Sequence, residues 1–211
     1  MDQSAKKIAL VEPSSFGFNI ETFKTNVLQN NIELNKKIIF SEFDNLLNQL
    51  SVNNISFEVL KSNSMSPDCI YPNNWVVTFD DGTYDLFSMQ SHNRRLERSN
   101  QNLAFLNSKY ILKNDLTAFE SNGIFLEGTG SLVLDRINKI AYLSESQRSS
   151  TILANKWAQL RKYNLITFKS YINDKPIYHT NVVMFIADKL AGVCFESIAD
   201  YKILKSRLSD K

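Results

Sequence analysis

Three segments of the chain share one pattern, in which a polar or ionisable residue precedes a candidate β-hairpin. The three residues are Asn74, Glu127 and His179, and they are separated by 53 and 52 positions. After each of them, two apolar runs rich in β-branched or aromatic residues flank a short polar turn, which is typical of paired antiparallel strands. A repeat of about 50 residues predicts a ring or array of similar units. The alternative is an α/β chain in which hairpins recur at such intervals without true repetition.

The rest of the chain alternates between strand and helix patterns, which predicts an α/β fold. The predicted hairpins comprise residues 75–79 with 83–87, 131–134 with 139–143, and 182–186 with 190–195. Further strands are expected at residues 6–11, 55–60 and 165–171. Helices with a buried apolar face are expected within residues 20–27, 39–50, 96–106, 153–160 and 201–208. No linker or low-complexity segment interrupts the chain, so residues 1–211 are expected to form a single domain.

Composition excludes several classes of protein. The formal net charge is only +2, which gives no electrostatic reason to expect binding to nucleic acid or to an acidic membrane. No apolar run is long enough to span a bilayer, and the first residues lack the apolar core of a signal peptide. Cys69 and Cys194 form neither a CxxC pair nor a disulfide framework. A reduced, cytoplasmic protein is therefore expected.

Glu127 and His179 are the residues best suited to chemistry. A carboxylate and an imidazole in one site can exchange protons with a substrate. Glu127 also adjoins Gly128, and glycine lets backbone and ligand approach closely. We expect Glu127, His179 and Asn74 to line one cavity at the entrances of their strands. The alternative is that His179 is a structural histidine, the commoner role of a single histidine.

Two neighbouring arginines, Arg94 and Arg95, lie in a polar segment and could bind an anionic group. The alternative is a salt-bridge cluster with Glu97 at the start of a helix. No group of residues has the spacing of metal ligands, and the glycines of residues 128–130 do not form a phosphate-binding loop. Neither a metal ion nor a cofactor is therefore expected.

Several segments resemble, in the same order, the amidinotransferase superfamily and, more narrowly, its arginine-deiminase-related, citrulline-utilisation branch of hydrolases. These segments are residues 72–76, 93–98, 126–136, 141–142 and 177–184. The resemblance implies a pentein fold, with five ββαβ-like units around a pseudo-fivefold axis, in agreement with the repeat described above. This chain would carry roughly four of those five units.

The resemblance also implies a reaction. Enzymes of this superfamily attack a guanidinium or ureido carbon with a cysteine, form a covalent intermediate, and act as hydrolases or amidinotransferases. Glu127 matches the acid that binds the guanidinium and supports the histidine, and His179 matches the catalytic histidine. A carboxylate can pair with a planar cation through two hydrogen bonds, and an imidazole can protonate the leaving amine. The implied ligand is a small arginine-like guanidino or ureido compound.

Substrate binding is further assigned by resemblance to three asparagines and the two loop arginines, namely Asn73, Asn74, Asn181, Arg94 and Arg95. Asn74 stands where better-known deiminases usually carry an aspartate. Asn181 follows the histidine where those enzymes often carry an acid. Two amides in place of two acids make the pocket less anionic, so a neutral or differently substituted substrate becomes more plausible than a strongly held arginine cation.

The nucleophile is the main departure from the superfamily. The expected cysteine belongs to a glycine-rich segment of the final unit, and neither Cys69 nor Cys194 fits that position. Both are expected to be core or near-core thiols, because buried structural cysteines are common. We therefore expect a chain that is truncated at its C-terminus and inactive alone.

Two alternatives to an enzyme that lacks its nucleophile remain open. One is a non-catalytic pentein module that binds a ligand or partner, and the other is one half of a split enzyme completed by a second, C-terminal chain. A missing unit would expose strand edges and core surface, so self-association is also expected. The DNA downstream of the codon for Lys211 discriminates between these readings, since a frame encoding a glycine-rich segment with a cysteine would favour an enzyme.

Overall fold

The computed structural model describes residues 2–26, 28–31, 34–62 and 65–209. The chain divides into two compact units, which are considered separately below. Unit 1 comprises Met1–Ser4, Phe87–Gln90 and Leu116–Lys211, and unit 2 comprises Ala5–Leu86 and Ser91–Asp115. The expectation that residues 1–211 form a single domain stays a prediction.

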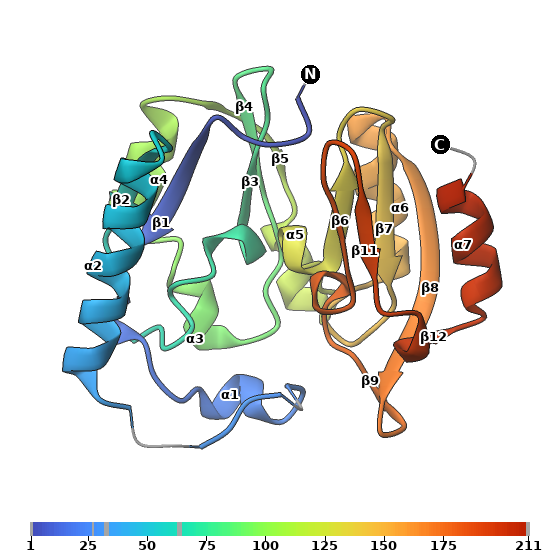
Figure 1. Ribbon diagram of the computed structural model, residues 1–211, viewed down its shortest axis with the longest axis horizontal. Coiled ribbons are helices and arrows are strands. Elements are labelled where there is room, and N and C mark those ends of the chain that lie inside the picture. The colour runs from blue at the N-terminus through green and yellow to red at the C-terminus, as the bar shows by residue number, and fades with distance from the viewer. Residues whose placement is uncertain (1, 27, 32–33, 63–64, 210–211) are drawn as a thin grey trace. The chain divides into compact units, whose positions relative to one another are not determined.

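Unit 2 contains two small sheets. β1 (Lys7–Val11) pairs in parallel with β2 (Ser56–Leu60). β3 (Val76–Thr78) pairs antiparallel with β4 (Thr83–Leu86), and β4 pairs in parallel with β5 (Ile111–Asp115). The α-helices and 3-10 helices of this unit, coloured blue to green in Figure 1, are η1 (Pro13–Ser15), α1 (Ile20–Phe23), α2 (Lys36–Val52), η2 (Pro72–Asn74), α3 (His92–Arg95) and α4 (Asn100–Asn107).

Asparagine side chains cap the first two α-helices of unit 2. The side chain of Asn19 accepts a hydrogen bond from the N–H of Glu21 at 3.1 Å, which confirms the predicted start of α1. α1 ends at Phe23, earlier than predicted, and Val27, which was expected in the same helix, lies outside the described residues. α2 contains no fully buried residue, and Leu46, expected on its buried face, is 44% exposed. The periodicity of α2 therefore predicted the helix correctly but overstated its burial.

Unit 1 is built on one larger sheet and a separate hairpin. In the sheet, β6 (Leu132–Asp135) pairs antiparallel with β7 (Ile140–Ser144), and β7 pairs in parallel with β8 (Asn164–Ile172). The hairpin joins β10 (Met184–Ile186) to β11 (Ala191–Val193). The remaining elements are η3 (Thr117–Asn122), α5 (Gly128–Ser131), α6 (Thr151–Arg161), β9 (Lys175–Pro176), η4 (Thr180–Val182), η5 (Phe195–Ser197), β12 (Ile198–Ala199) and α7 (Tyr201–Ser209).

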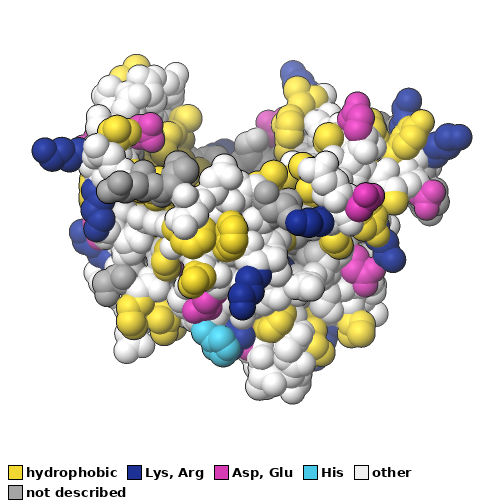
Figure 2. All heavy atoms as spheres, turned by 90° about the horizontal axis from the view of Figure 1, so that it is seen from below, with side chains coloured by type: hydrophobic (Ala, Val, Ile, Leu, Met, Phe, Trp, Pro, Cys, Tyr) yellow, Lys and Arg dark blue, Asp and Glu magenta, His cyan; other side chains and the backbone are white. Residues whose placement is uncertain are grey.

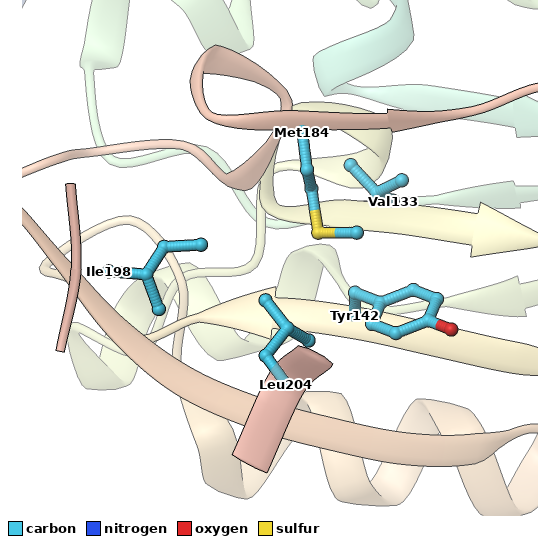
Figure 3. Close-up of a cluster of buried hydrophobic side chains, with 5 residues drawn as sticks. All are labelled: Val133, Tyr142, Met184, Ile198 and Leu204. Atoms are coloured by element: carbon cyan, nitrogen blue, oxygen red, sulfur yellow. The ribbon is translucent and has the colours of Figure 1, made fainter. Parts of the chain in front are cut away.

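The sheet of unit 1 has apolar contacts on both faces. Helix α6 packs against β7 and β8 and buries Leu153 and Trp157, and Figure 1 shows this helix behind the sheet and the β10–β11 hairpin in front of it. In Figure 3, side chains from β6, β7, β10, β12 and α7 converge on one cluster, formed by Val133, Tyr142, Met184, Ile198 and Leu204. The predicted faces of α6 and α7 thus reach the core, but Leu160 and Tyr201 are 48% and 42% exposed because they lie at helix ends.

The strand pairing repeats between the two units. In both β3–β4–β5 and β6–β7–β8, an antiparallel hairpin is followed by helical segments and a third strand parallel to the second. The third hairpin, β10–β11, follows η4 in the same way that β6 follows α5. The three predicted hairpins are therefore confirmed. β5 was not predicted, because its sequence ILKND has neither a long apolar run nor a clear alternation.

The register of the repeat differs from the one that the spacing suggested. Glu127 and His179 immediately precede short helices and lie five positions before the first residues of β6 and β10. Tyr71 lies five positions before the first residue of β3 and immediately precedes η2, whereas Asn74 is the last residue of η2. The use of Asn74 as the third equivalent position was therefore wrong, and its spacing from Glu127 reflects no shared register.

Charged and apolar side chains are mixed on the surface of the protein (Figure 2). On the face seen in Figure 2, acidic and basic side chains are interspersed with apolar ones, as a net charge of +2 would suggest. None of the helices that the structure describes is long and apolar enough to cross a bilayer.

Candidate functional site

Glu127 and His179 meet in the interior of unit 1. The imidazole Nε2 of His179 lies 2.7 Å from Oε2 of Glu127, within hydrogen-bonding distance. Both residues are buried, Glu127 completely. The two residues were expected to share a site, and their side chains are in direct contact although 52 positions separate them.

Local structure brings the two side chains together. Glu127 precedes α5 and His179 precedes η4, and these short helices pack on each other. The hydroxyl of Thr180 accepts a hydrogen bond from the N–H of Ser144 at 2.7 Å and donates to the carbonyl of Ser131. Thr180 thereby ties the segment of His179 both to the start of β6 and to the end of β7.

Backbone contacts fix Glu127 in the same way. Its N–H donates to the hydroxyl of Ser131 at 2.9 Å and to the carbonyl of Arg148 at 3.2 Å. Its carboxylate Oε1 accepts the N–H of Gln90 at 3.0 Å. Gly128, the next residue, has φ of 42°, in the left-handed region that favours glycine. The glycine noted in the sequence therefore lets the chain turn directly after the glutamate.

An arginine that was not predicted as a site residue completes this group. Nη1 of Arg148 lies 3.8 Å from Oε2 of Glu127, and Arg148 is almost fully buried. Its guanidinium carbon lies 4.8 Å from the centre of the Tyr178 ring, and that ring lies 4.7 Å from the ring of His179. Arg148 carried no signal in the sequence, because it stands alone in a turn between β7 and α6.

Asn181 lies next to this group in sequence but is exposed. It is the second residue of η4, two positions after His179. Its assignment to substrate binding therefore stays a prediction.

In unit 2, the predicted binding residues Asn74 and Arg94 contact each other. Nη1 of Arg94 donates to the side-chain oxygen of Asn74 at 2.6 Å. The same guanidinium binds both carboxylate oxygens of Glu97, at 2.8 and 3.2 Å, and the carbonyl of Tyr71 at 3.1 Å. Arg94, Asn74 and Glu97 are all buried. This is the salt-bridge cluster given above as the alternative for Arg94.

The other two candidates of unit 2 are less enclosed. Arg95 is half-buried, and its Nη1 lies 3.3 Å from Nδ1 of the exposed His92. Asn73 is half-buried within η2. Direct contact of Asn73, Asn74, Arg94 or Arg95 with a substrate stays a prediction.

Unit 2 contains a second polar cluster. Of its residues, only Asn19 was predicted to have a structural role, as a helix cap. The side-chain amide of Asn19 donates to Asp68 at 2.8 Å, and the hydroxyl of Thr22 donates to the same carboxylate oxygen at 3.0 Å. The amide of Asn93 donates to Asn19 at 2.7 Å. These contacts join α1 to α3 and to the segment that precedes η2, and periodicity cannot reveal them because each partner belongs to a different loop or helix.

The two cysteines have opposite environments. Cys69 is buried, as expected, and burial, with the charge of Glu97 as a smaller cause, raises the pKa of its thiol to about 11. Cys194 is exposed, so the expectation of a core thiol was wrong for this residue. The reason is that β11 ends at Val193, and Cys194 begins the turn into η5, with its sulfur 3.3 Å from the hydroxyl of Ser197.

Metal binding finds no support in the part of the chain that the structure describes. Among those residues, no three histidine, cysteine, aspartate or glutamate side chains come together as a metal ion would need. The ionisable groups around Glu127 instead form a carboxylate, imidazole and guanidinium cluster.

Sequence comparison places these residues in a known family. Residues 12–210 match the family model described as N,N dimethylarginine dimethylhydrolase, eukaryotic. The chain belongs to the dimethylarginine dimethylhydrolase family. The predicted relation to arginine-deiminase-like hydrolases that modify guanidino groups is thereby confirmed. No curated protein matches the sequence.

Solved structures of similar fold include ArgZ and AgrE. The N-terminal domain of ArgZ, an arginine dihydrolase from Cyanobacteria solved with substrate, has a TM-score of 0.77 at 14% identity, with 95% of this chain and 72% of that chain covered. AgrE, solved as a cysteine-to-alanine variant with L-arginine, has a TM-score of 0.76 at 14% identity, with 94% and 29% covered.

A more distant structure comes from a protein that shares the name of the family. A dimethylarginine dimethylaminohydrolase adduct with S-methyl-L-thiocitrulline has a TM-score of 0.57 at 12% identity, with 81% of this chain and 63% of that chain covered. At these identities the likeness shows the fold, and the predicted pentein fold is confirmed.

Proposed function

We propose that the chain binds a small guanidino or ureido compound of arginine type at Glu127 and His179. The observation that carries this proposal is the 2.7 Å contact between these two buried residues. A buried carboxylate and imidazole in contact are costly to desolvate, so their retention favours a role in ligand chemistry. Membership of the dimethylarginine dimethylhydrolase family supports the choice of ligand.

We infer a separate task for each of the two residues in such a site. The carboxylate of Glu127 holds Nε2 of His179, so the proton on that nitrogen is fixed and Nδ1 is the nitrogen that exchanges a proton with the ligand. The imidazole then serves as general acid for a leaving amine and as general base for water. Glu127 orients the imidazole and supplies the negative charge that a guanidinium requires.

The class of ligand is set by charge. Asn181, which follows His179 where the resemblance implies an acid, favours a neutral ureido or substituted guanidino compound over free arginine. AgrE was solved with L-arginine, so a cationic guanidino ligand is to be tested beside a neutral ureido ligand. Hydrolysis is the reaction of the family, and amidino transfer would need an amine in place of water.

The nucleophile is the part of the proposal with least support in the chain itself. Cys69 is buried with a pKa raised to about 11, so it supplies almost no thiolate near neutral pH. Cys194 is exposed, and its sulfur contacts Ser197 and Glu196 rather than an imidazole. We therefore propose that these 211 residues bind the ligand without turning it over.

Two roles are consistent with binding alone. One is a pentein module that binds a ligand or partner without catalysis, and the other is an assembly in which a second chain supplies the thiol. Mixing experiments with a candidate second chain distinguish them, because only the second role predicts turnover on mixing.

Ligand binding by calorimetry tests the proposal. L-arginine, N,N-dimethyl-L-arginine and L-citrulline are titrated into the wild-type chain and into Glu127→Gln. Loss of the carboxylate charge should weaken binding of the two cations by about tenfold or more and change citrulline binding little. The matched control is Glu145→Gln, because Glu145 is an exposed glutamate of the same unit. Absence of binding to all three compounds at millimolar concentration would refute the proposal.

A further inference from the structure

We propose that Arg148 is a positioning residue that keeps Glu127 ionised and His179 able to release its proton. Its guanidinium lies 3.8 Å from the same carboxylate oxygen that contacts His179. The carboxylate therefore has two cationic or potentially cationic partners on one oxygen. This proposal concerns the protonation of His179, so it can be tested without a ligand. Only its consequence for ligand chemistry rests on the proposed function.

The fold holds Arg148 in this place from several sides. Its carbonyl accepts hydrogen bonds from the N–H of Glu127 at 3.2 Å and from the hydroxyl of Ser131 at 2.8 Å. Its N–H donates to the hydroxyl of Ser146 at 3.1 Å. Its guanidinium faces the ring of Tyr178, an arrangement that is favourable for a cation and an aromatic ring. The side chain is thus placed by the surrounding structure rather than by its contact with Glu127 alone.

Charge balance then decides the state of His179. A guanidinium stays protonated in proteins, so Arg148 already neutralises the carboxylate of Glu127. With a neutral imidazole the buried group has no net charge, whereas a protonated imidazole would give it a net positive charge, which burial opposes. Without Arg148, protonation of His179 would instead neutralise Glu127. The guanidinium therefore favours the neutral imidazole, the form that can accept a proton at Nδ1.

Among the described residues, the elements packed most closely on the segment of His179 carry few other titratable groups. The elements packed on η4 are α5, β6, β7 and β10. α5 and β10 contain no titratable residue, β7 contributes Tyr142, and β6 ends at Asp135, whose carboxylate accepts the N–H of Asn138 at 2.8 Å. In the turn that carries Arg148, Glu145 is exposed. Arg148 thus supplies a permanent cation at the same Glu127 oxygen that His179 contacts.

The test is the titration of His179 by NMR in the absence of ligand. The sequence has two histidines, so selective ¹³C labelling of histidine gives two signals, and His92→Gln assigns them. Replacement Arg148→Met removes the charge and keeps an apolar stem. It is expected to raise the titration midpoint of His179 by about one pH unit or more. Arg148→Lys retains the charge and should leave the midpoint close to that of the wild type.

A second arginine of the same unit provides the control. Arg161, at the end of α6, is also buried, so Arg161→Met reports the general effect of losing a buried arginine. An unchanged or lowered midpoint in Arg148→Met would overturn the proposal, as would equal shifts in Arg148→Met, Arg148→Lys and Arg161→Met. A change of midpoint that His92 shows equally reflects the sample as a whole, so it is subtracted from the change measured for His179.

A double variant covers the case in which Arg148→Met does not fold. Removing one partner of a buried ion pair leaves an unpaired charge, whereas removing both does not. Glu127→Gln is therefore compared with Glu127→Gln/Arg148→Met, and the midpoint of His179 is again expected to be higher where the guanidinium is absent. If the midpoint of His179 depends on Arg148 as expected but no ligand binds, the proposed function is refuted and the role of Arg148 stands.

Discussion

Glu127 and His179 occupy the same position in two successive repeats of the fold. Each precedes a short helix and lies five positions before the first strand of a hairpin. The two short helices pack on each other, so the repeat itself brings the carboxylate and the imidazole together. A single replacement in either short helix should therefore disturb both residues.

Thr180 is the first such residue to test. Thr180→Val keeps the shape of the side chain but leaves the N–H of Ser144 and the carbonyl of Ser131 without their partner in the protein interior. An unsatisfied buried group costs roughly 1–3 kcal/mol, so a loss of this size in the free energy of unfolding is expected in urea denaturation. Binding of the arginine-type ligand should weaken as well, because the segment of His179 loses its anchor.

The control for this change is Thr167→Val. Thr167 is an exposed threonine of β8 in the same unit, and a surface substitution of this kind usually changes stability by less than about 0.5 kcal/mol. Equal stability of Thr180→Val and the wild type would show that the hydroxyl does not anchor the site.

The buried pair of Arg94 and Glu97 should contribute strongly to the stability of unit 2. Arg94→Met leaves the carboxylate of Glu97 buried and without the guanidinium that binds both of its oxygens. Breaking a buried pair in this way typically costs about 3–5 kcal/mol. The change is measured as a shift of the urea midpoint, followed by the fluorescence of the buried Trp75.

An exposed pair of the same unit gives the comparison. Lys113 lies 3.1 Å from Asp81, and both side chains are about half exposed. Lys113→Met should cost no more than about 1 kcal/mol. Similar losses in the two variants would contradict the structural role assigned to Arg94 and would favour the predicted contact with a substrate carboxylate.

The thiols should differ sharply in reactivity. At pH 7.5, iodoacetamide is expected to modify Cys194 rapidly and Cys69 only after unfolding, because the thiolate is the reactive form and Cys69 is buried with a pKa raised to about 11. Intact-mass analysis of the wild type, Cys69→Ser and Cys194→Ser gives the number and identity of the modified residues. Rapid modification of Cys69 in the native chain would contradict its placement in the core.

The raised pKa of Cys69 also predicts how stability depends on pH. Between about pH 9, the ordinary pKa, and about pH 11, the unfolded chain loses the thiol proton while the folded chain keeps it. Stability should therefore fall as pH rises through this window, since deprotonation favours the unfolded state. Cys69→Ala should lose less stability than the wild type over the same window when both are measured in urea at pH 8.5 and pH 10.5.

The sequence was sufficient for features that depend on local pattern. Apolar runs around polar turns predicted all three hairpins, and the cap at Asn19 was correct. Glu127 and His179 could be paired because each stands before such a hairpin. The short helices α5 and η4 were missed, since three or four residues are too few to show helical periodicity.

Features that depend on distant contacts could not be predicted. Arg148 reaches Glu127 from a turn, and nothing in its neighbouring residues indicates this. Cys194 lies between Val193 and Phe195, so it looked like part of an apolar strand, yet β11 ends one residue earlier and the side chain is exposed. The equal spacing of Asn74 was misleading, because Asn74 is the last residue of its short helix whereas Glu127 and His179 precede theirs.

Turnover is the final property to be tested. Glu127 and His179 can orient a ligand and move protons, but neither replaces a thiolate that forms a covalent intermediate. Loss of the nucleophile in a unit of cooperating residues costs on the order of 10⁶ in rate in a well-studied serine hydrolase. The 211-residue chain is therefore expected to release no measurable citrulline, ammonia or methylamine from arginine or methylated arginines. Robust turnover that Cys194→Ser abolishes would instead make the exposed Cys194 the nucleophile, and turnover that survives both cysteine replacements would exclude a cysteine mechanism for this chain.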